Sequence, residues 1–284
     1  MPAINTVSIL GVGLIGGSFA LALRNVGYRG RILGVSSPST LSRATELGVI
    51  DEGRPLERAL PVSDLVYMAQ PVWRIVAQLE QVRAHAPPHA LVTDAGSTKQ
   101  VIVARARELL FPGPAFVGGH PMAGKEGRGV EIAEAGLFRS ATYALVPTGD
   151  DLPDTPVFRE FRAWLDAMGC RIRTMEAAEH DRVVGWTSQM PQLVSTALAA
   201  ALGSGLADTS EIEVAGDGLR DMTRLAASSY EVWADILQSN QGPIDDALGA
   251  VIGELEALRL ALRSKGAGAH FERGQALRAA LDRV

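Results

Sequence analysis

The sequence predicts an α/β protein in which a doubly wound parallel sheet is followed by an all-α domain. Over residues 1–175, short apolar runs with strand character alternate with helical segments. From residue 176 to residue 284 this alternation stops, and long stretches rich in Ala and Leu take its place. Alternating strands and helices are typical of a parallel sheet with helices on both faces. We therefore expect one domain over residues 1–175 and a second over residues 176–284.

The elements of the first domain follow from the spacing of its apolar residues. The expected strands cover residues 6–10, 31–35, 65–69, 91–93, 115–118, 143–146 and 171–175. The expected helices cover residues 18–26, 76–84, 99–110 and 158–167.

The second domain is expected to be a helical bundle. Its helical stretches cover residues 176–203, 210–239, 243–264 and 268–283. An apolar stripe with helical spacing runs through Leu248, Ile252, Leu255, Leu258 and Leu262. A domain this small and apolar would expose much apolar surface on its own, so we expect a homodimer through this half.

The stretch around Pro191 has two further features. Residues 183–207 carry no charged side chain, but their polar residues argue against a membrane span, and we expect a buried helix. Pro191 lacks a backbone donor and crowds the carbonyl of Thr187, which predicts a kink.

Composition excludes several classes of function. The net charge of -5 provides no surplus of Lys and Arg for nucleic acid or an anionic membrane. The single cysteine, Cys170, rules out an intramolecular disulfide and a Cys-rich metal site, which fits a cytoplasmic protein without a metal centre. Residues 1–23 lack the basic segment and the continuous apolar run of a secretory signal, so no signal peptide is expected.

A glycine-rich turn follows the first expected strand and opens a helix. Gly11, Gly13 and Gly16 match the fingerprint of a Rossmann-type dinucleotide-binding domain, with Leu14 and Ile15 between them. Gly11 permits the tight turn, Gly13 lets the pyrophosphate approach the backbone, and Gly16 allows helix and strand to pack closely. We expect these five residues to contact the cofactor; the alternative is a glycine turn without a ligand.

The residues after the second expected strand bear on the choice between NAD and NADP. Ser36 and Ser37 stand where many such domains carry an acid that binds the ribose hydroxyls. Without that acid, small hydroxyls and Arg43 can accept a 2′-phosphate. A serine can equally make a weaker contact to the ribose of NAD, so both cofactors remain open.

His120 and Ser97 are candidate active-site residues. His120 lies between glycines and a proline, directly after a short strand, where ligands bind at the carboxyl edge of such sheets. An imidazole there can act as a base, or it can only cap backbone groups in a loop. Ser97 is placed to cap the next helix and can also face a ligand.

An arginine in the helical half is a candidate for binding a carboxylate. Asp221, Arg224 and Ser228 are spaced by three and four residues, hence on one helical face, with Trp233 further along. Arg is the usual choice for bidentate binding of a carboxylate. The alternative is a surface Arg224 paired with Asp221.

Together these motifs resemble the prephenate/arogenate dehydrogenase family. The likeness spans almost the whole chain. It comprises the turn at residues 11–16, the run 94–99, the loop 118–126, the segment 179–181 and the run 218–224 up to Trp233. The resemblance implies a Rossmann domain followed by a helical dimerisation domain, with the active site between them.

The resemblance also implies an activity and roles for residues. The family uses NAD or NADP in the oxidative decarboxylation of prephenate to 4-hydroxyphenylpyruvate and CO2, or of arogenate to tyrosine and CO2, in tyrosine biosynthesis. His120 resembles the histidine that takes the proton of the ring hydroxyl, and Ser97 its companion there. Arg224 resembles the arginine that holds a substrate carboxylate. Substrate-lining roles are implied for Ser228, Trp233 and Glu126.

The chain departs from the family pattern at three places. Gln189 and Gln192 stand where members often carry histidines, which bears on the choice between a keto acid and an amino acid substrate. Lys125 stands where a small hydroxyl residue is common and adds a cation near the substrate. We expect neither a regulatory module nor a chorismate mutase domain on this chain.

Two other functions share parts of this pattern. A 3-hydroxyacid dehydrogenase has the same layout but relies on a catalytic lysine in its helical half, where Lys265 is the only lysine here. A protein that senses a dinucleotide without turnover would lack a catalytic base, yet His120 is present.

Overall fold

The chain forms two compact units. The computed structural model describes residues 3–206, 208–264 and 266–283. The first unit comprises Met1–Val184 and Ser228–Asn240, and the second comprises Gly185–Ala227 and Gln241–Val284. One helix that follows the Arg224 region in sequence therefore belongs to the first unit.

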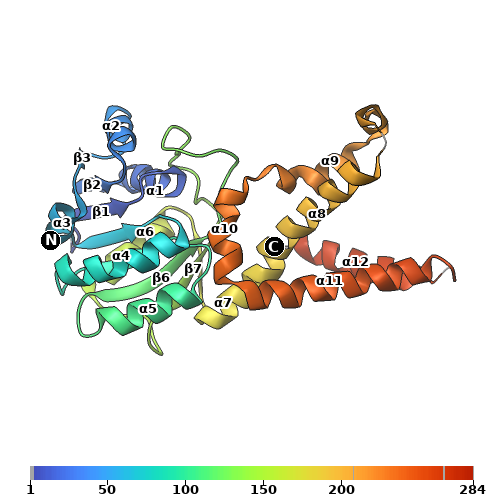
Figure 1. The fold of residues 1–284 in the computed structure, drawn as a ribbon. Coiled ribbons are helices and arrows are strands. Elements are labelled where there is room, and N and C mark those ends of the chain that lie inside the picture. The colour runs from blue at the N-terminus through green and yellow to red at the C-terminus, as the bar shows by residue number, and fades with distance from the viewer. Residues whose placement is uncertain (1–2, 207, 265, 284) are drawn as a thin grey trace. The chain divides into compact units, whose positions relative to one another are not determined.

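The first unit is built on one sheet of eight strands in the order β3-β2-β1-β4-β5-β6-β7-β8 (Figure 1). The strands are β1 (Thr6–Leu10), β2 (Arg31–Val35), β3 (Glu52–Gly53), β4 (Leu65–Met68), β5 (Leu91–Asp94), β6 (Ala115–Pro121), β7 (Thr142–Pro147) and β8 (Arg171–Thr174). All neighbouring strands are parallel except β6 and β7. The predicted doubly wound sheet is confirmed, and the antiparallel pair arises because no crossover helix joins β6 to β7.

Helices cover both faces of this sheet. They are α1 (Leu14–Asn25), α2 (Pro38–Glu46), α3 (Leu56–Ala59), α4 (Val72–His85), α5 (Gln100–Leu110), α6 (Pro156–Ala167), α7 (Ala177–Val184) and α10 (Tyr230–Ser239). Side chains of successive strand residues enter opposite faces. In β4, Tyr67 packs in the cluster with Phe19 of α1 and Phe161 of α6, whereas Met68 packs with residues of α4 and α5. The ring centroids of Phe19 and Tyr67 are 3.9 Å apart and stacked.

Strand β6 is longer than the sequence predicted. The expected strand ended at residue 118, with His120 in a loop, but Gly119 and His120 are paired with Leu145 and Ala144 of β7. Two glycines followed by a histidine and a proline have no strand periodicity, so the pairing partner and not local preference extends the strand. His120 is consequently held by a sheet backbone.

Helix α2 was not expected from apolar periodicity. It begins after Ser37, whose hydroxyl accepts a hydrogen bond from the Thr40 amide, and Pro38 occupies its first turn. Both are recognised start signals of a helix. Only Ala44 on this short helix is fully buried, which explains the missing apolar stripe.

The second unit is helical, as predicted. It contains a π-helical turn at Gly185–Gln189, α8 (Met190–Gly205), α9 (Asp217–Thr223), α11 (Gln241–Ala261), α12 (Gly268–Leu281) and two 3₁₀ turns, Thr209–Val214 and Arg224–Ala227. Helix α8 packs against α9, α11 and the turn Arg224–Ala227. The predicted irregularity near Pro191 takes the form of the π-helical turn, which includes Thr187, the residue whose carbonyl a proline at 191 would crowd.

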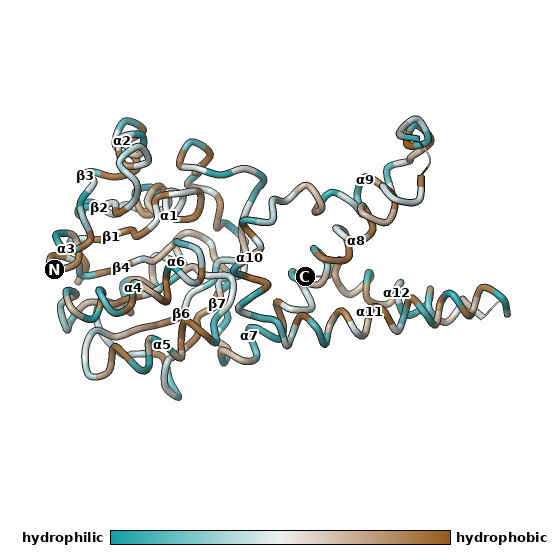
Figure 2. Tube along the Cα trace, viewed as in Figure 1, coloured by the Kyte–Doolittle hydropathy of each residue, from teal (hydrophilic) through white to brown (hydrophobic). Residues whose placement is uncertain are grey.

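The expectation of a buried helix over residues 183–207 is wrong for the single chain. On α8 only Gln192 and Ser195 are buried. Apolar residues recur along α8 and α11 (Figure 2), and Ile252 and Leu255 are 55% and 59% exposed. The second unit alone does not cover the apolar side chains of Ile252 and Leu255. No helix in the described ranges is long and apolar enough to cross a membrane.

Candidate active site

The glycine turn joins β1 to α1 in the first unit. Gly11 has φ +93°, and a Cβ there would lie 2.5 Å from the Ala69 oxygen. A Cβ on Gly16 would lie 2.1 Å from the Gly11 oxygen, so both positions require glycine. A Cβ on Gly13 would meet nothing within 4 Å. The backbone at Gly13 is therefore open at the amino end of α1, which fits an approaching pyrophosphate.

The remaining predicted cofactor residues lie near this turn or at α2. Leu14 and Ile15 form the first turn of α1. Ser36 follows β2 directly, and Ser37 caps α2. The Arg43 guanidinium lies 3.1 Å from a Glu46 carboxylate oxygen, so it is already paired on its own helix. Contact of these residues with NAD or NADP stays a prediction.

A buried ion pair fixes the strand that carries His120. Lys99 and Asp94 are both fully buried and paired with each other. The Lys99 ammonium also donates to the Gly119 oxygen at 2.7 Å, and the Gly119 amide donates to Asp94 Oδ1 at 3.1 Å. Burial lowers the pKa of Lys99, while Asp94 opposes that shift. Both backbone polar groups of the residue before His120 are thus held by this pair.

His120 is hydrogen-bonded to a second histidine. His120 Nδ1 lies 2.9 Å from His180 Nε2, and His180 Nδ1 lies 2.7 Å from Asp181 Oδ1. His180 and Asp181 are fully buried on α7, whereas His120 is partly exposed. Burial, the neighbouring His180 and the Lys99 cation lower the pKa of His120 well below its usual value near 6.5. A neutral imidazole at pH 7 is able to accept a proton.

Asp181 also caps α5. Its carboxylate accepts hydrogen bonds from the amides of Lys99, at 2.7 Å, and Gln100, at 2.9 Å. The interpretation of Ser97 as the cap is therefore wrong, because a carboxylate distant in sequence takes that place. Ser97 lies partly exposed in the turn between β5 and α5. Its hydroxyl makes no hydrogen bond to any described residue, which leaves it available to a ligand.

Within the first unit, the end of helix α10 lies against the residues that precede α5. Ser239 Oγ lies 2.8 Å from Thr98 Oγ1, and Asn240 Nδ2 donates to the backbone oxygen of Asp181 at 2.8 Å. Trp233 is half-buried on this helix. Ser228 is exposed just before it.

The loop after β6 carries the two remaining candidates of the first unit. Lys125 Nζ lies 3.1 Å from a Glu134 oxygen in the same loop. Glu126 is exposed beside it. Their contact with substrate stays a prediction.

Three predicted substrate residues lie in the second unit. Arg224 begins a 3₁₀ turn, and Gln189 is buried in the π-helical turn. Gln192 is buried and donates through Nε2 to the Leu225 oxygen at 2.8 Å. It thereby supports the turn that begins at Arg224.

The shared helical face of Asp221, Arg224 and Ser228 is not found. Helix α9 ends at Thr223, a 3₁₀ turn follows, and Ser228 belongs to the first unit. Among the described residues Arg224 forms no ion pair with Asp221. The arginine is exposed.

The sequence interpretation missed the residues that organise His120. Asp94, Lys99, His180 and Asp181 were noted only as parts of family motifs. Adjacent His180 and Asp181 on an expected helix were the available signal, because such residues need hydrogen-bonding partners wherever they are buried. Lys265 lies outside the described residues.

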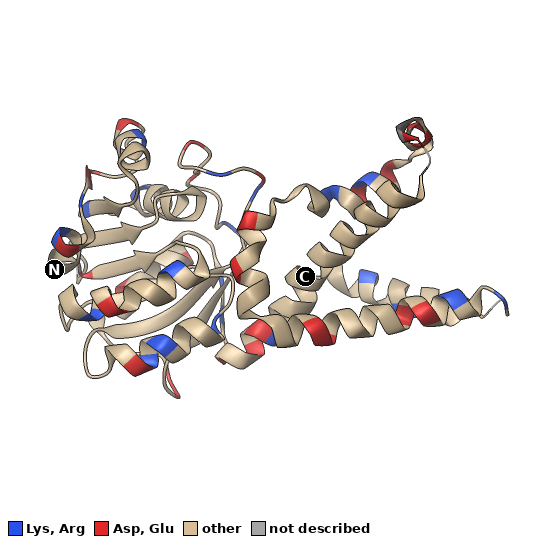
Figure 3. Ribbon diagram, in the orientation of Figure 1, with Lys and Arg blue, Asp and Glu red and all other residues tan. Residues whose placement is uncertain are grey.

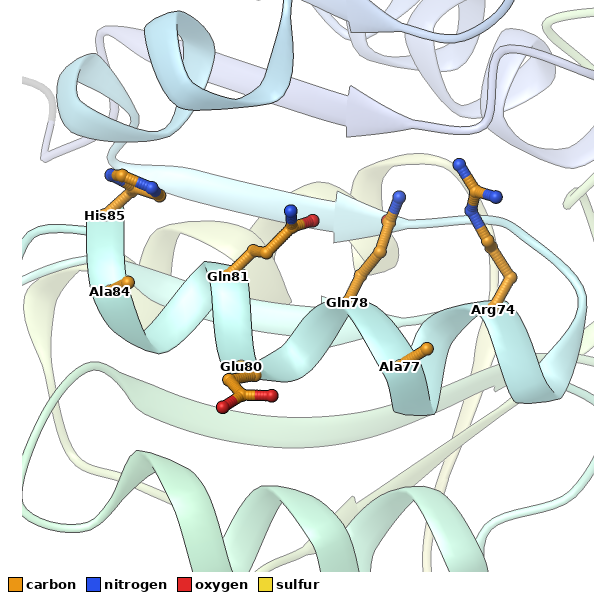
Figure 4. Close-up of a pocket in the computed structure, with 7 residues that line it drawn as sticks. All are labelled: Arg74, Ala77, Gln78, Glu80, Gln81, Ala84 and His85. Atoms are coloured by element: carbon orange, nitrogen blue, oxygen red, sulfur yellow. The ribbon is translucent and has the colours of Figure 1, made fainter.

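A surface hollow along α4 is separate from this site. It is lined by Arg74, Ala77, Gln78, Glu80, Gln81, Ala84 and His85. All of these come from one helix, and Arg74, Gln78, Gln81 and His85 point to the same side of it (Figure 4). None belongs to the glycine turn or to the histidine pair.

An α/β unit with an open glycine turn and a neutral histidine on a sheet strand is the arrangement of a dinucleotide-binding oxidoreductase. Residues 19–174 match the family model described as prephenate dehydrogenase, nucleotide-binding domain, and residues 176–273 match the one described as prephenate dehydrogenase, dimerization domain. The chain belongs to the prephenate dehydrogenase family.

Individual relatives agree with this assignment. Prephenate dehydrogenase of Bacillus subtilis (strain 168) is 34% identical over 90% of this chain and 69% of its own length. The structure of prephenate dehydrogenase from Aquifex aeolicus in complex with hydroxyphenyl propionate and NAD+ superposes with a TM-score of 0.87, at 29% identity, covering 98% of both chains. Synechocystis arogenate dehydrogenase has a TM-score of 0.80 at 30% identity, covering 98% of this chain and 99% of that one.

Two alanine substitutions in the glycine turn should affect different properties, one cofactor affinity and the other stability. Gly13→Ala should weaken cofactor binding about tenfold or more, because the methyl group occupies space that the pyrophosphate needs, and should leave thermal stability unchanged. Gly16→Ala should lower the free energy of unfolding by about 1–3 kcal/mol through the clash with the Gly11 oxygen. Cofactor titration and denaturant unfolding of both variants measure this. Unchanged cofactor affinity in Gly13→Ala would contradict the binding site.

Proposed function

We propose that this chain is an NAD(P)-dependent dehydrogenase that oxidatively decarboxylates prephenate or arogenate. The observation that carries the proposal is the neutral, partly exposed His120, hydrogen-bonded to His180 on the unit that holds the glycine turn. Relatives named prephenate dehydrogenase and arogenate dehydrogenase support both substrates. We keep residues 1–175 and 176–284 as the proposed division of the sequence into cofactor and substrate domains. In the structure, residues 176–184 and 228–240 belong to the first compact unit.

His120 is proposed to act as the base of the reaction. A nicotinamide cofactor held at the glycine turn of Gly11, Gly13 and Gly16 would supply the hydride acceptor for the ring carbon that bears the hydroxyl. His120 takes the proton of that hydroxyl as the carbon becomes electron-poor. The ring carboxylate leaves as CO2, its bonding electrons complete the aromatic ring, and His120 returns the proton to the phenol oxygen. No net proton is produced, so the base acts catalytically. Ser97 is proposed as a second hydrogen-bonding partner of the hydroxyl.

The second unit is proposed to supply part of the substrate recognition. An exposed arginine without an ion-pair partner in the described residues suits a substrate carboxylate, and Gln192 stabilises the turn of Arg224. Gln189 and Gln192 are uncharged, which bears on the choice between the keto acid of prephenate and the amino acid of arogenate. Four residues of the first unit are proposed to line the substrate as well: Trp233, Ser228, Lys125 and Glu126.

Turnover tests the proposed function directly. Purified protein is incubated with prephenate or arogenate and with NAD+ or NADP+, and the absorbance of the reduced nicotinamide is followed. We expect reduction in at least one of the four combinations. His120→Asn should lower that rate by about 10²–10⁴ while cofactor affinity stays within twofold. Absence of reduction in all four combinations would refute the proposal, and near wild-type turnover in His120→Asn would refute the base.

The pH dependence follows from the pKa of His120. That pKa is lowered by burial, by His180 and by Lys99, so the base is neutral and active at neutral pH. Protonation removes the base, so kcat/KM should be constant above about pH 7 and fall as the pH decreases through a pKa below 6.5. Initial rates between about pH 5 and 9, with enzyme-free blanks, measure the profile. An acidic limb centred above pH 7 would contradict the assignment.

A homodimer through the second unit is proposed from its uncovered apolar residues. Helix α8 carries no charged side chain, as its uniform tan colour in Figure 3 shows, and Ile252 on α11 is 55% exposed. Sedimentation equilibrium should give twice the 30.1 kDa chain mass. Ile252→Glu, at a position exposed in the single chain, should shift the mass toward the monomer. A wild-type monomer at micromolar concentration would exclude the dimer.

A further inference from the structure

We infer that His180 and Asp181 are positioning residues that fix the tautomer of His120, placing its proton on Nδ1 and leaving Nε2 to accept the substrate proton. The inference rests on the proposed role of His120 as the base. It extends that role to two residues on a helix 60 positions further along the chain.

The hydrogen bonds from His120 to His180 and from His180 to Asp181 have a defined donor-to-acceptor direction because the last acceptor is a carboxylate. Asp181 accepts from the Lys99 amide at 2.7 Å, from the Gln100 amide at 2.9 Å and pairs with His180 Nδ1 at 2.7 Å. The two amides lie at the start of α5, where the helix dipole favours a negative charge. An ionised carboxylate has no proton to donate, so His180 Nδ1 must carry the proton of that hydrogen bond.

The same reasoning determines which nitrogen of His120 carries a proton. A neutral imidazole has one donor and one acceptor nitrogen, so a His180 protonated on Nδ1 accepts through Nε2. His120 Nδ1, 2.9 Å away, must be the donor. The neutral His120 consequently keeps its lone pair on Nε2. Lys99, paired with Asp94, lies close to both rings and disfavours a second proton on either of them.

The anchoring of Asp181 explains why this direction is stable. Besides the two amides of α5, its backbone oxygen accepts from Asn240 Nδ2 at 2.8 Å. Its side chain is completely buried, so no water competes for the carboxylate. Reversing the tautomer of His120 would require Asp181 to become a donor or to lose its partner.

Asp181→Asn is the substitution designed to reverse the direction of the hydrogen bonds from His120 through His180 to residue 181. Asp181 Oδ1 faces both the Lys99 amide and His180 Nδ1, whereas Oδ2 faces the Gln100 amide. An asparagine whose oxygen stays on the Gln100 amide places its NH2 group at His180 Nδ1, which forces the proton to Nε2 and leaves the Lys99 amide without its acceptor. That proton is donated to His120 Nδ1, which leaves the proton of His120 on the wrong nitrogen. We expect kcat to fall by about 10²-fold or more, as the wrong tautomer does in serine proteases. Cofactor affinity should change little, whereas the melting temperature should fall because an α5 amide loses its acceptor.

A double-mutant cycle separates this role from a structural one. The variants are Asp181→Asn, His120→Asn and the two combined. If Asp181 acts through His120, adding Asp181→Asn to His120→Asn should lower kcat less than about threefold. Multiplicative losses would overturn the inference. Wild-type turnover is measured first and tests the proposed function separately, so the two failures are distinguishable.

Asp64 offers a matched control. Its carboxylate also accepts two backbone amides, from Asn5 at 2.8 Å and Thr6 at 3.0 Å, and lies 3.2 Å from His89 Nε2. It precedes β4, at the amino edge of the sheet, whereas His120 is near the carboxyl end of β6. Asp64→Asn should leave kcat unchanged. An equal loss of kcat in Asp64→Asn and Asp181→Asn would overturn the inference.

Substitutions at His180 keep the test decisive if Asp181→Asn does not fold. A glutamine carries a donor and an acceptor on different atoms, so His180→Gln can donate to Asp181 and accept from His120 Nδ1. His180→Leu can do neither. We expect His180→Gln to retain at least about tenfold more kcat than His180→Leu, with similar cofactor affinity in both. Equal kcat values in these two variants would overturn the inference.

Discussion

The carboxylate of Asp181 is the interaction on which the organisation of this site depends. It binds the first amides of α5, pairs with His180, and its backbone oxygen is held by Asn240 at the end of α10. Hydrogen bonds to a charged group contribute about 1.5–3 kcal/mol each, and they are strongest where water is excluded. One buried side chain thus joins three helices and orients the histidine pair.

A second buried charge complements the first. The Lys99 and Asp94 pair holds the backbone of Gly119, so the strand carrying His120 is fixed from one side while His180 fixes its ring. Removing one partner of a buried ion pair costs about 3–5 kcal/mol, so substitution of either Lys99 or Asp94 should destabilise the strand that carries His120. The base, His120, is consequently held by the sheet of the first unit, and its side chain is still partly exposed to a substrate.

Local patterns in the sequence were enough to predict most of the fold. Strands such as β1 and β4 were predicted because a sheet covered on both faces buries every residue of a strand, which gives a continuous apolar run. Strand β3, two exposed residues, was not predicted. The extension of β6 through His120 was missed because Gly119 and His120 depend on a partner strand. The cap of α5 was assigned to Ser97 because it is near in sequence, whereas Asp181 is 82 residues away from Lys99. The support that Gln192 gives to the Arg224 turn likewise connects residues that no local spacing relates.

The protonation state of the two imidazoles tests the central claim most directly. Long-range ¹⁵N–¹H NMR of protein labelled at histidine nitrogens identifies which ring nitrogen carries the proton, and spectra of His120→Asn and His180→Gln assign the signals. At neutral pH the account predicts one proton on each ring, on Nδ1 of both His120 and His180. A proton on Nε2 of His120, or two protons on either ring, would contradict it.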